Sequence, residues 1–175
     1  DSLSRLIRER QVEQSTNSSY DLSDSLTSNS SWTRRIDYNS SGLVTDGYDA
    51  RGVHTSFSYD DLNRVTQIGY SDSTPAAHYY YDSQSLPSGA PSYTPSNTTG
   101  RLLAITYGSG ATGDYFAYDV MGRATTQKQV TGSTTYGLSY TYNYAGLLTG
   151  ETYPSGRALS FSYDDGGRLS SLGDG

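Results

Sequence analysis

The sequence contains no cysteine, no long hydrophobic run and no cluster of basic residues. The absence of cysteine excludes disulfides, thiolate metal sites and cysteine nucleophiles. The longest apolar run, Leu102 to Ile105, is far shorter than the roughly 20 residues that span a bilayer. The 12 Lys and Arg residues are scattered among 18 Asp and Glu residues, and the net charge is −6. We therefore expect neither a nucleic-acid partner nor a membrane span.

Tyrosine is what the chain has in abundance. The 175 residues include 18 Tyr, although only 33% of the chain is hydrophobic. An aromatic content of 13% also distinguishes the chain from disordered sequences, which are poor in aromatic residues. We predict a folded protein in which Tyr side chains do most of the packing.

One short phrase recurs along the chain. "FSYDDLNRV" runs from Phe57 to Val65, and "FSYDDGGRL" runs from Phe161 to Leu169. The shared unit is aromatic-x-Tyr-Asp/Asn-x-x-Gly-Arg-apolar, and its copies are spaced by about 21 residues. The first residues, "DSLSRLI", match the tail of a further copy. We predict a single array of about eight copies over residues 1–175.

The motif residues of this array are its predicted structural sites. They are Tyr20, Asp21, Tyr38, Asn39, Gly42, Tyr59, Asp60, Arg64, Tyr81, Asp82, Gly100, Arg101, Tyr118, Asp119, Gly122, Arg123, Tyr142, Asn143, Gly146, Tyr163, Asp164, Gly167 and Arg168.

One copy is interrupted by an insertion. Its Tyr81 and Asp82 are separated from Gly100 and Arg101 by residues 83–99, which hold three of the five prolines. Because the segment is rich in Pro, Ser and Thr, we predict a surface loop that projects from the array and whose removal is tolerated.

Each copy predicts a β-hairpin. Phe57 and Tyr59 lie two residues apart, which is the spacing of side chains on one face of a strand. An Asp or Asn followed three residues later by Gly is typical of a type I turn with a left-handed residue at its exit. We predict an all-β fold of antiparallel β-hairpin repeats wound as a ribbon, with turns at Asp60–Asn63, Asp119–Gly122 and Asp164–Gly167. Because an isolated hairpin is marginally stable, neighbouring copies must share their burial.

The repeat resembles the YD repeat of the Rhs family, which includes teneurins and the C subunits of insecticidal toxin complexes. The resemblance implies a β-ribbon spiral that forms a hollow shell. In polymorphic toxins such a shell encloses a C-terminal toxic domain, and in teneurins it is part of a cell-surface receptor. The copies at Tyr38 and Tyr142 depart from the pattern, with Leu43 and Leu147 in place of Arg. None of the five prolines follows Asp, so the family's aspartyl self-cleavage is not carried over.

The resemblance implies a secreted or cell-surface scaffold. We expect a non-catalytic segment of a longer chain whose shell encapsulates or presents a C-terminal toxin. Its expected partners are neighbouring YD repeats of the same or another chain, and an enclosed toxin domain or surface glycans. The alternative is an extracellular adhesin or receptor scaffold that binds glycans or partner proteins.

Other interpretations of the motif residues involve chemistry. The Tyr-Asp pairs suit acid/base dyads or a sugar-binding platform, but their recurrence in one register favours a structural role. The arginines suit anion binding, but we expect each of Arg5, Arg64, Arg101, Arg123 and Arg168 to stack on a Tyr or pair with a turn Asp.

No constellation of catalytic or metal-binding residues is evident. His54 and His78, the only histidines, show no metal spacing and no Ser/His/Asp pattern. Asp164 and Asp165 lack the rest of a calcium loop. Glycosylation triplets begin at Asn17, Asn29, Asn39 and Asn97, as chance allows in a chain rich in Ser and Thr. We expect no cofactor, no metal and no enzymatic activity.

Overall fold

The fold is all-β. The computed structural model describes residues 1–11 and 32–175, and in these ranges it contains thirteen antiparallel strands and no helix. Hydrogen-bonded neighbours follow one another in chain order, from β1 to β13. The predicted succession of antiparallel hairpins is therefore confirmed.

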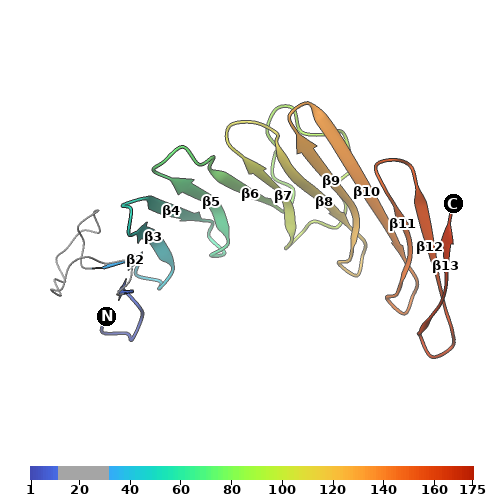
Figure 1. Ribbon diagram of the computed structural model, residues 1–175, viewed down its shortest axis with the longest axis horizontal. Helices are drawn as coiled ribbons and strands as arrows, with labels where there is room; N and C mark the ends of the chain where they lie inside the picture. The colour runs from blue at the N-terminus through green and yellow to red at the C-terminus, as the bar shows by residue number, and fades with distance from the viewer. Residues whose placement is uncertain (12–31) are drawn as a thin grey trace. The chain divides into compact units, whose positions relative to one another are not determined.

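The chain divides into two compact units, residues 1–78 and 79–175. In unit 1 the strands lie side by side in chain order (Figure 1). These are β1 (Arg8–Glu9), β2 (Arg34–Tyr38), β3 (Val44–Asp49), β4 (His54–Tyr59) and β5 (Val65–Tyr70), and β6 (Ala77–Tyr81) begins at the end of this unit.

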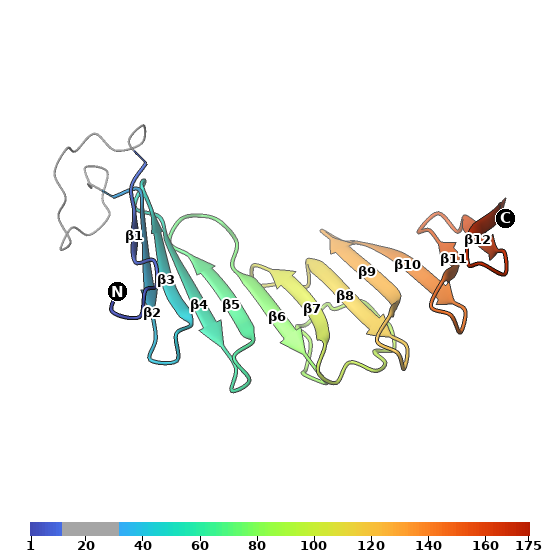
Figure 2. The same cartoon turned by 90° about the horizontal axis from the view of Figure 1, so that it is seen from below.

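Unit 2 repeats the same arrangement, as Figure 2 shows for β8 to β10. Its strands are β7 (Leu102–Tyr107), β8 (Gly113–Tyr118), β9 (Ala124–Thr131), β10 (Thr134–Tyr142), β11 (Leu148–Thr152), β12 (Ala158–Tyr163) and β13 (Leu169–Asp174).

The three predicted turns are confirmed. The backbone N–H of Asn63 donates to the Asp60 carbonyl oxygen at 2.9 Å, and Gly122 with Asp119 and Gly167 with Asp164 form the same bond. The third residue after the Asp has a positive φ, 84° at Gly122 and 62° at Asn63. Glycine tolerates this left-handed backbone because it has no Cβ, and Asn adopts it more readily than most residues. The register shifts by one residue beside each motif Tyr, as in a type I turn closed by a β-bulge.

The prediction that the insertion projects from the array is wrong. Residues 83–99, here called the strap, do not project from the sheet but fold back onto unit 2. Leu86, Ala90 and Tyr93 pack against a buried cluster of Ala104, Tyr115 and Val130.

The strap is also held by polar contacts. The Tyr93 ring meets the Tyr115 ring edge-on, with centroids 6.1 Å apart, and Lys128 Nζ donates to the Ser92 carbonyl oxygen at 2.8 Å. The Tyr118 N–H donates to the Ser96 carbonyl oxygen at 2.9 Å. The strap therefore forms a second layer over β7–β9, because the face beneath it is apolar.

Candidate functional site

The repeated turn is the site that the sequence singles out, and its Asp organises it. Asp119 Oδ1 accepts the backbone N–H groups of Met121 and Arg123 at 2.9 and 3.0 Å, and Oδ2 accepts Arg123 Nε at 2.6 Å. The same three bonds recur at Asp60 with Arg64 and at Asp164 with Arg168. Each carboxylate thus accepts hydrogen bonds both from the backbone of the turn and from the arginine that directly follows the turn.

The hydrogen bonds also favour the ionised form of the turn carboxylates. At Asp164 the backbone N–H of Arg168 lowers the pKa of the carboxyl below its ordinary 3.8, against an opposing effect of desolvation. At Asp119 desolvation works to raise the pKa, but the bonds from Arg123 outweigh it and the pKa is lowered. The turn carboxylates are therefore ionised at neutral pH.

The motif Tyr connects its copy to the copy on the adjacent strand, which for Tyr38 is the copy that ends at Arg5. The Tyr118 hydroxyl donates to the carbonyl oxygen of Leu102, the first residue after the preceding turn, at 2.8 Å. We call this bond the latch. Equivalent latches join Tyr38 to Leu6, Tyr59 to Val44, Tyr142 to Ala124 and Tyr163 to Leu148, at 2.7 to 2.9 Å. In five copies, a polar atom on one hairpin thus satisfies a backbone acceptor on its neighbour.

The arginine of one copy covers the Tyr of the copy on the adjacent strand. Arg123 Cζ lies 4.6 Å from the centre of the Tyr142 ring, and Arg5 Cζ lies 4.5 Å from that of Tyr38. Arg101 lies over Tyr118 at 5.8 Å. Each such arginine contacts the next copy through a cation–π interaction, and Arg5 and Arg123 also pair with the Asp of their own turn.

The motif Gly admits this arginine. A Cβ added at Gly122 would lie 2.6 Å from Arg101 Nη2, closer than a real side chain approaches. Gly42 and Gly146 also face Arg5 and Arg123, but there the nearest guanidinium nitrogens lie 3.6 and 3.7 Å from such a Cβ, which is ordinary van der Waals contact. Glycine therefore serves the positive φ of each of these turns, and at Gly122 it also admits the arginine of the neighbouring copy.

The interrupted copy keeps the ends of its turn together. The Asp82 N–H donates to the Arg101 carbonyl oxygen at 3.1 Å, and the Gly100 N–H donates to Asp82 Oδ1 at 2.6 Å. Tyr81 ends β6. The Tyr20–Asp21 copy and the triplets at Asn17 and Asn29 lie outside the described residues.

Unit 1 contains a polar cluster that the sequence analysis did not predict. His54 Nε2 lies 2.6 Å from Asp46 Oδ1, and the His54 ring stacks on Tyr48 with centroids 4.6 Å apart. Arg35 lies over Tyr48 and also pairs with Asp37. The hydrogen bond from His54 lowers the pKa of Asp46. The cross-strand pairs Arg35–Tyr48 and Tyr48–His54 bring these residues together, and only the strand register reveals them.

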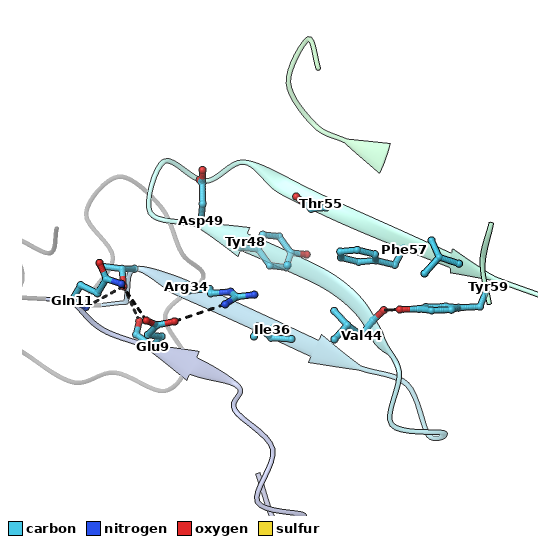
Figure 3. Close-up of a pocket in the computed structure, with 13 residues that line it drawn as sticks. Glu9, Gln11, Arg34, Ile36, Val44, Tyr48, Asp49, Thr55, Phe57 and Tyr59 are labelled. Carbon is cyan, nitrogen blue, oxygen red and sulfur yellow. Dashed lines mark hydrogen bonds and ion pairs between the residues drawn. The ribbon is translucent and has the colours of Figure 1, made fainter. Parts of the chain in front are cut away.

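A pocket of about 660 Å³ lies against β1–β5 in unit 1 (Figure 3). Ile36, Val44 and Phe57 supply its apolar lining. At the polar end, Arg34 Nη1 lies 3.9 Å from Glu9 Oε2, and Gln11 Nε2 donates to Glu9 Oε1 at 3.2 Å. These polar groups contact one another and do not converge on a single point, so the lining forms no recognisable catalytic arrangement.

Within residues 1–11 and 32–175, no three His, Cys, Asp or Glu side chains are grouped as metal ligands. In the same part of the chain, no helix has the length and hydrophobicity to cross a membrane.

The pattern of the RHS Repeat family matches residues 38–75 and 142–175. Each segment contains two motif turns, those of Asn39 and Asp60 in the first and those of Asn143 and Asp164 in the second. No curated protein matches the chain.

Solved structures show the same fold at low sequence identity. A crystal structure of TcdB2-TccC3 aligns with a TM-score of 0.62 at 13% identity, over 81% of this chain and 8% of that one. A crystal structure of TcdB2-TccC3-TEV aligns equally well, at 12% identity over the same shares. A Photorhabdus luminescens Tc holotoxin pore aligns with a TM-score of 0.51 at 14% identity, over 79% of this chain and 10% of that one. The chain thus spans about a tenth or less of the length of these proteins.

Proposed function

We propose that the chain is a non-catalytic segment of a YD-repeat shell that encapsulates or presents a C-terminal toxin or effector. The match of the RHS Repeat pattern to residues 38–75 and 142–175, and the fold shared with TcdB2-TccC3, support this proposal. The observation that carries this proposal is the latch. The same Tyr-to-carbonyl bond joins hairpin to hairpin in five copies, which suits a continuous wall.

The energetics of the copies favour a wall over independent modules. Burying one large apolar side chain stabilises a fold by roughly 1.5 to 3 kcal/mol, whereas ordering the backbone costs about 1 to 2 kcal/mol per residue. In a single hairpin of about 21 residues, the free energy gained by burying a few side chains is smaller than the free energy lost in ordering the backbone. Repeat arrays become stable because neighbouring copies bury side chains against one another.

The proposed setting is a secreted or cell-surface protein. The TcdB2-TccC3 structures share this fold over 81% of the chain, which supports neighbouring YD repeats as the immediate partners. An enclosed toxin domain is the further partner that we propose.

The test uses the native protein that carries these repeats. We expect a chain much longer than 175 residues, with a C-terminal domain that resists added protease while the repeats are intact. Mass spectrometry of the digested protein measures this protection. Tyr118→Phe and Tyr142→Phe together should weaken two latches and speed cleavage of that domain, while Tyr144→Phe, at a fully exposed ring, should not.

A native chain little longer than these residues, monomeric in solution, would contradict the shell. A chain that continues into surface modules and binds glycans on an array would instead favour the adhesin alternative.

A further inference from the structure

The first residue of each turn varies together with the residue four places later. Where a turn of the repeat motif starts with Asp, Arg ends it, and where it starts with Asn, Leu ends it. In the described residues, the uninterrupted motif turns are Asp1–Arg5, Asp60–Arg64, Asp119–Arg123 and Asp164–Arg168 on one side, and Asn39–Leu43 and Asn143–Leu147 on the other. The turn at Asp49 lies between motif turns and ends in Val53, and there Asp49 Oδ2 accepts Arg51 Nε at 2.9 Å instead. We call the first kind ionic turns and the second kind neutral turns.

Both kinds close the backbone in the same way. The N–H of Asn143 donates to the Leu147 carbonyl oxygen at 3.0 Å, and the N–H of Asp119 donates to that of Arg123 at 2.9 Å. Asn143 Oδ1 accepts the Leu147 N–H at 2.9 Å, as Asp119 Oδ1 accepts that of Arg123. The side-chain oxygen that caps the turn therefore does not require a charge.

The two kinds differ in the second side-chain atom. In ionic turns, Oδ2 accepts Nε of the arginine at 2.6 to 2.8 Å. In the neutral turn at Asn143, Leu147 Cδ1 lies 3.7 Å from where a Cβ on Gly167 would stand. That is the place that Arg123 Nη1 takes beside Gly146, also at 3.7 Å. Leucine thus fills the space between copies that arginine fills elsewhere.

Mixed pairs are unfavourable in either direction. An Asp opposite Leu leaves Oδ2 partly desolvated without its charged donor. An Asn opposite Arg directs an NH₂ group, which has only donors, at a guanidinium, which also has only donors. A charge-assisted bond fixes the arginine more firmly than a neutral one does.

We propose that the first turn residue is a positioning residue matched to the residue four places later. The Asp of an ionic turn holds the arginine where it covers the Tyr of the next copy, and Asn replaces it only where Leu makes that contact by packing. The matching rests on contacts within the motif turns and between neighbouring copies, so it holds whether or not the repeats enclose a cargo.

The test is a pair of double-mutant cycles in the protein that carries these repeats. One cycle converts a neutral turn with Asn143→Asp, Leu147→Arg and both together. The other converts an ionic turn with Asp119→Asn, Arg123→Leu and both together. Urea midpoints are measured at low salt and at 1 M NaCl. We expect each single change to lower the midpoint, and each double variant to lose less than half the sum of the two single losses at low salt.

A second measurement applies even where one variant folds poorly. The carboxyl introduced by Asn143→Asp is titrated by carbon NMR with and without Leu147→Arg. We expect a pKa below the ordinary value when the arginine is present, and a higher one when it is absent. This difference in pKa reports the ion pair between the two introduced side chains and does not depend on the free energy of unfolding. Additive losses in both cycles, or the same pKa in both variants, would overturn the proposal.

Discussion

At the scale of single residues, the latch gives the Tyr hydroxyl a contribution to stability beyond that of the Tyr ring. Tyr118→Phe keeps the ring under Arg101 but removes the bond to the Leu102 carbonyl oxygen. We expect the free energy of unfolding to fall by about 1 kcal/mol, the usual net contribution of such a bond. Tyr118→Ala also removes the packing and should cost about 3 kcal/mol. Urea unfolding followed by tyrosine fluorescence measures both, with Tyr144→Phe as the control. Equal effects of Tyr118→Phe and Tyr144→Phe would show that the latch contributes nothing.

Tyr93 in the strap provides a prediction for alkaline pH. Burial raises its pKa from 10.0 to about 12, so the folded protein keeps the phenol proton after the unfolded chain has lost it. Stability from this residue is complete below pH 10 and is lost as the pH rises from 10 to about 12. We expect unfolding titrations to show a smaller loss in Tyr93→Phe than in the wild-type chain. Burial also raises the pKa of Tyr115 and Tyr118, so part of the loss should remain. A profile unchanged by Tyr93→Phe would contradict the burial of this hydroxyl.

At the scale of elements, the strap is an integral layer of unit 2. Tyr115 is fully buried and Val130 is 6% exposed, and the strap residues Leu86, Ala90 and Tyr93 pack against their cluster. Deleting residues 84–98 should therefore lower the urea midpoint and create a surface that binds a hydrophobic dye.

A point substitution tests the strap without changing the chain length. Tyr93→Ala removes the edge-on contact with Tyr115 and should lower the free energy of unfolding by about 2 kcal/mol, since the ring is only partly buried. Thr94→Ala, at the exposed neighbouring position, is the matched control. A strap deletion as stable as the parent would restore the projecting loop that the sequence predicted.

At the scale of the whole molecule, each copy bonds to its neighbours in the chain. In such arrays stability is the sum of unit and nearest-neighbour terms. Tyr163→Phe, which removes the latch to Leu148 between β11 and β12, should speed amide hydrogen exchange in β11–β13. Exchange in β2–β4 should stay as it was, because these strands lie in the other unit. Hydrogen exchange with mass spectrometry measures the two regions in one experiment, and a uniform increase would indicate a single cooperative block.

The strands and the turns could be predicted from the sequence alone. Phe57 and Tyr59 mark a strand through their spacing of two, and Asp60 with Asn63 marks a turn. Both signals are local, because the bonds that make a turn join residues two to four positions apart. The resemblance to the Rhs family rests on the same residues, and the RHS Repeat pattern matches two of the segments that contain them.

The contacts of the motif residues and the segment that covers the sheet became clear only from the tertiary structure. The latch of Tyr118 depends on Leu102, 16 residues away, through the register of strands that local sequence does not specify. The strap had one overlooked signal. Tyr115 stands three residues before its motif Tyr, where the copies at Tyr59, Tyr142 and Tyr163 have serine. That exchange makes the second face of β8 apolar, and an apolar face in water must be covered. Covering it is why the insertion folds back.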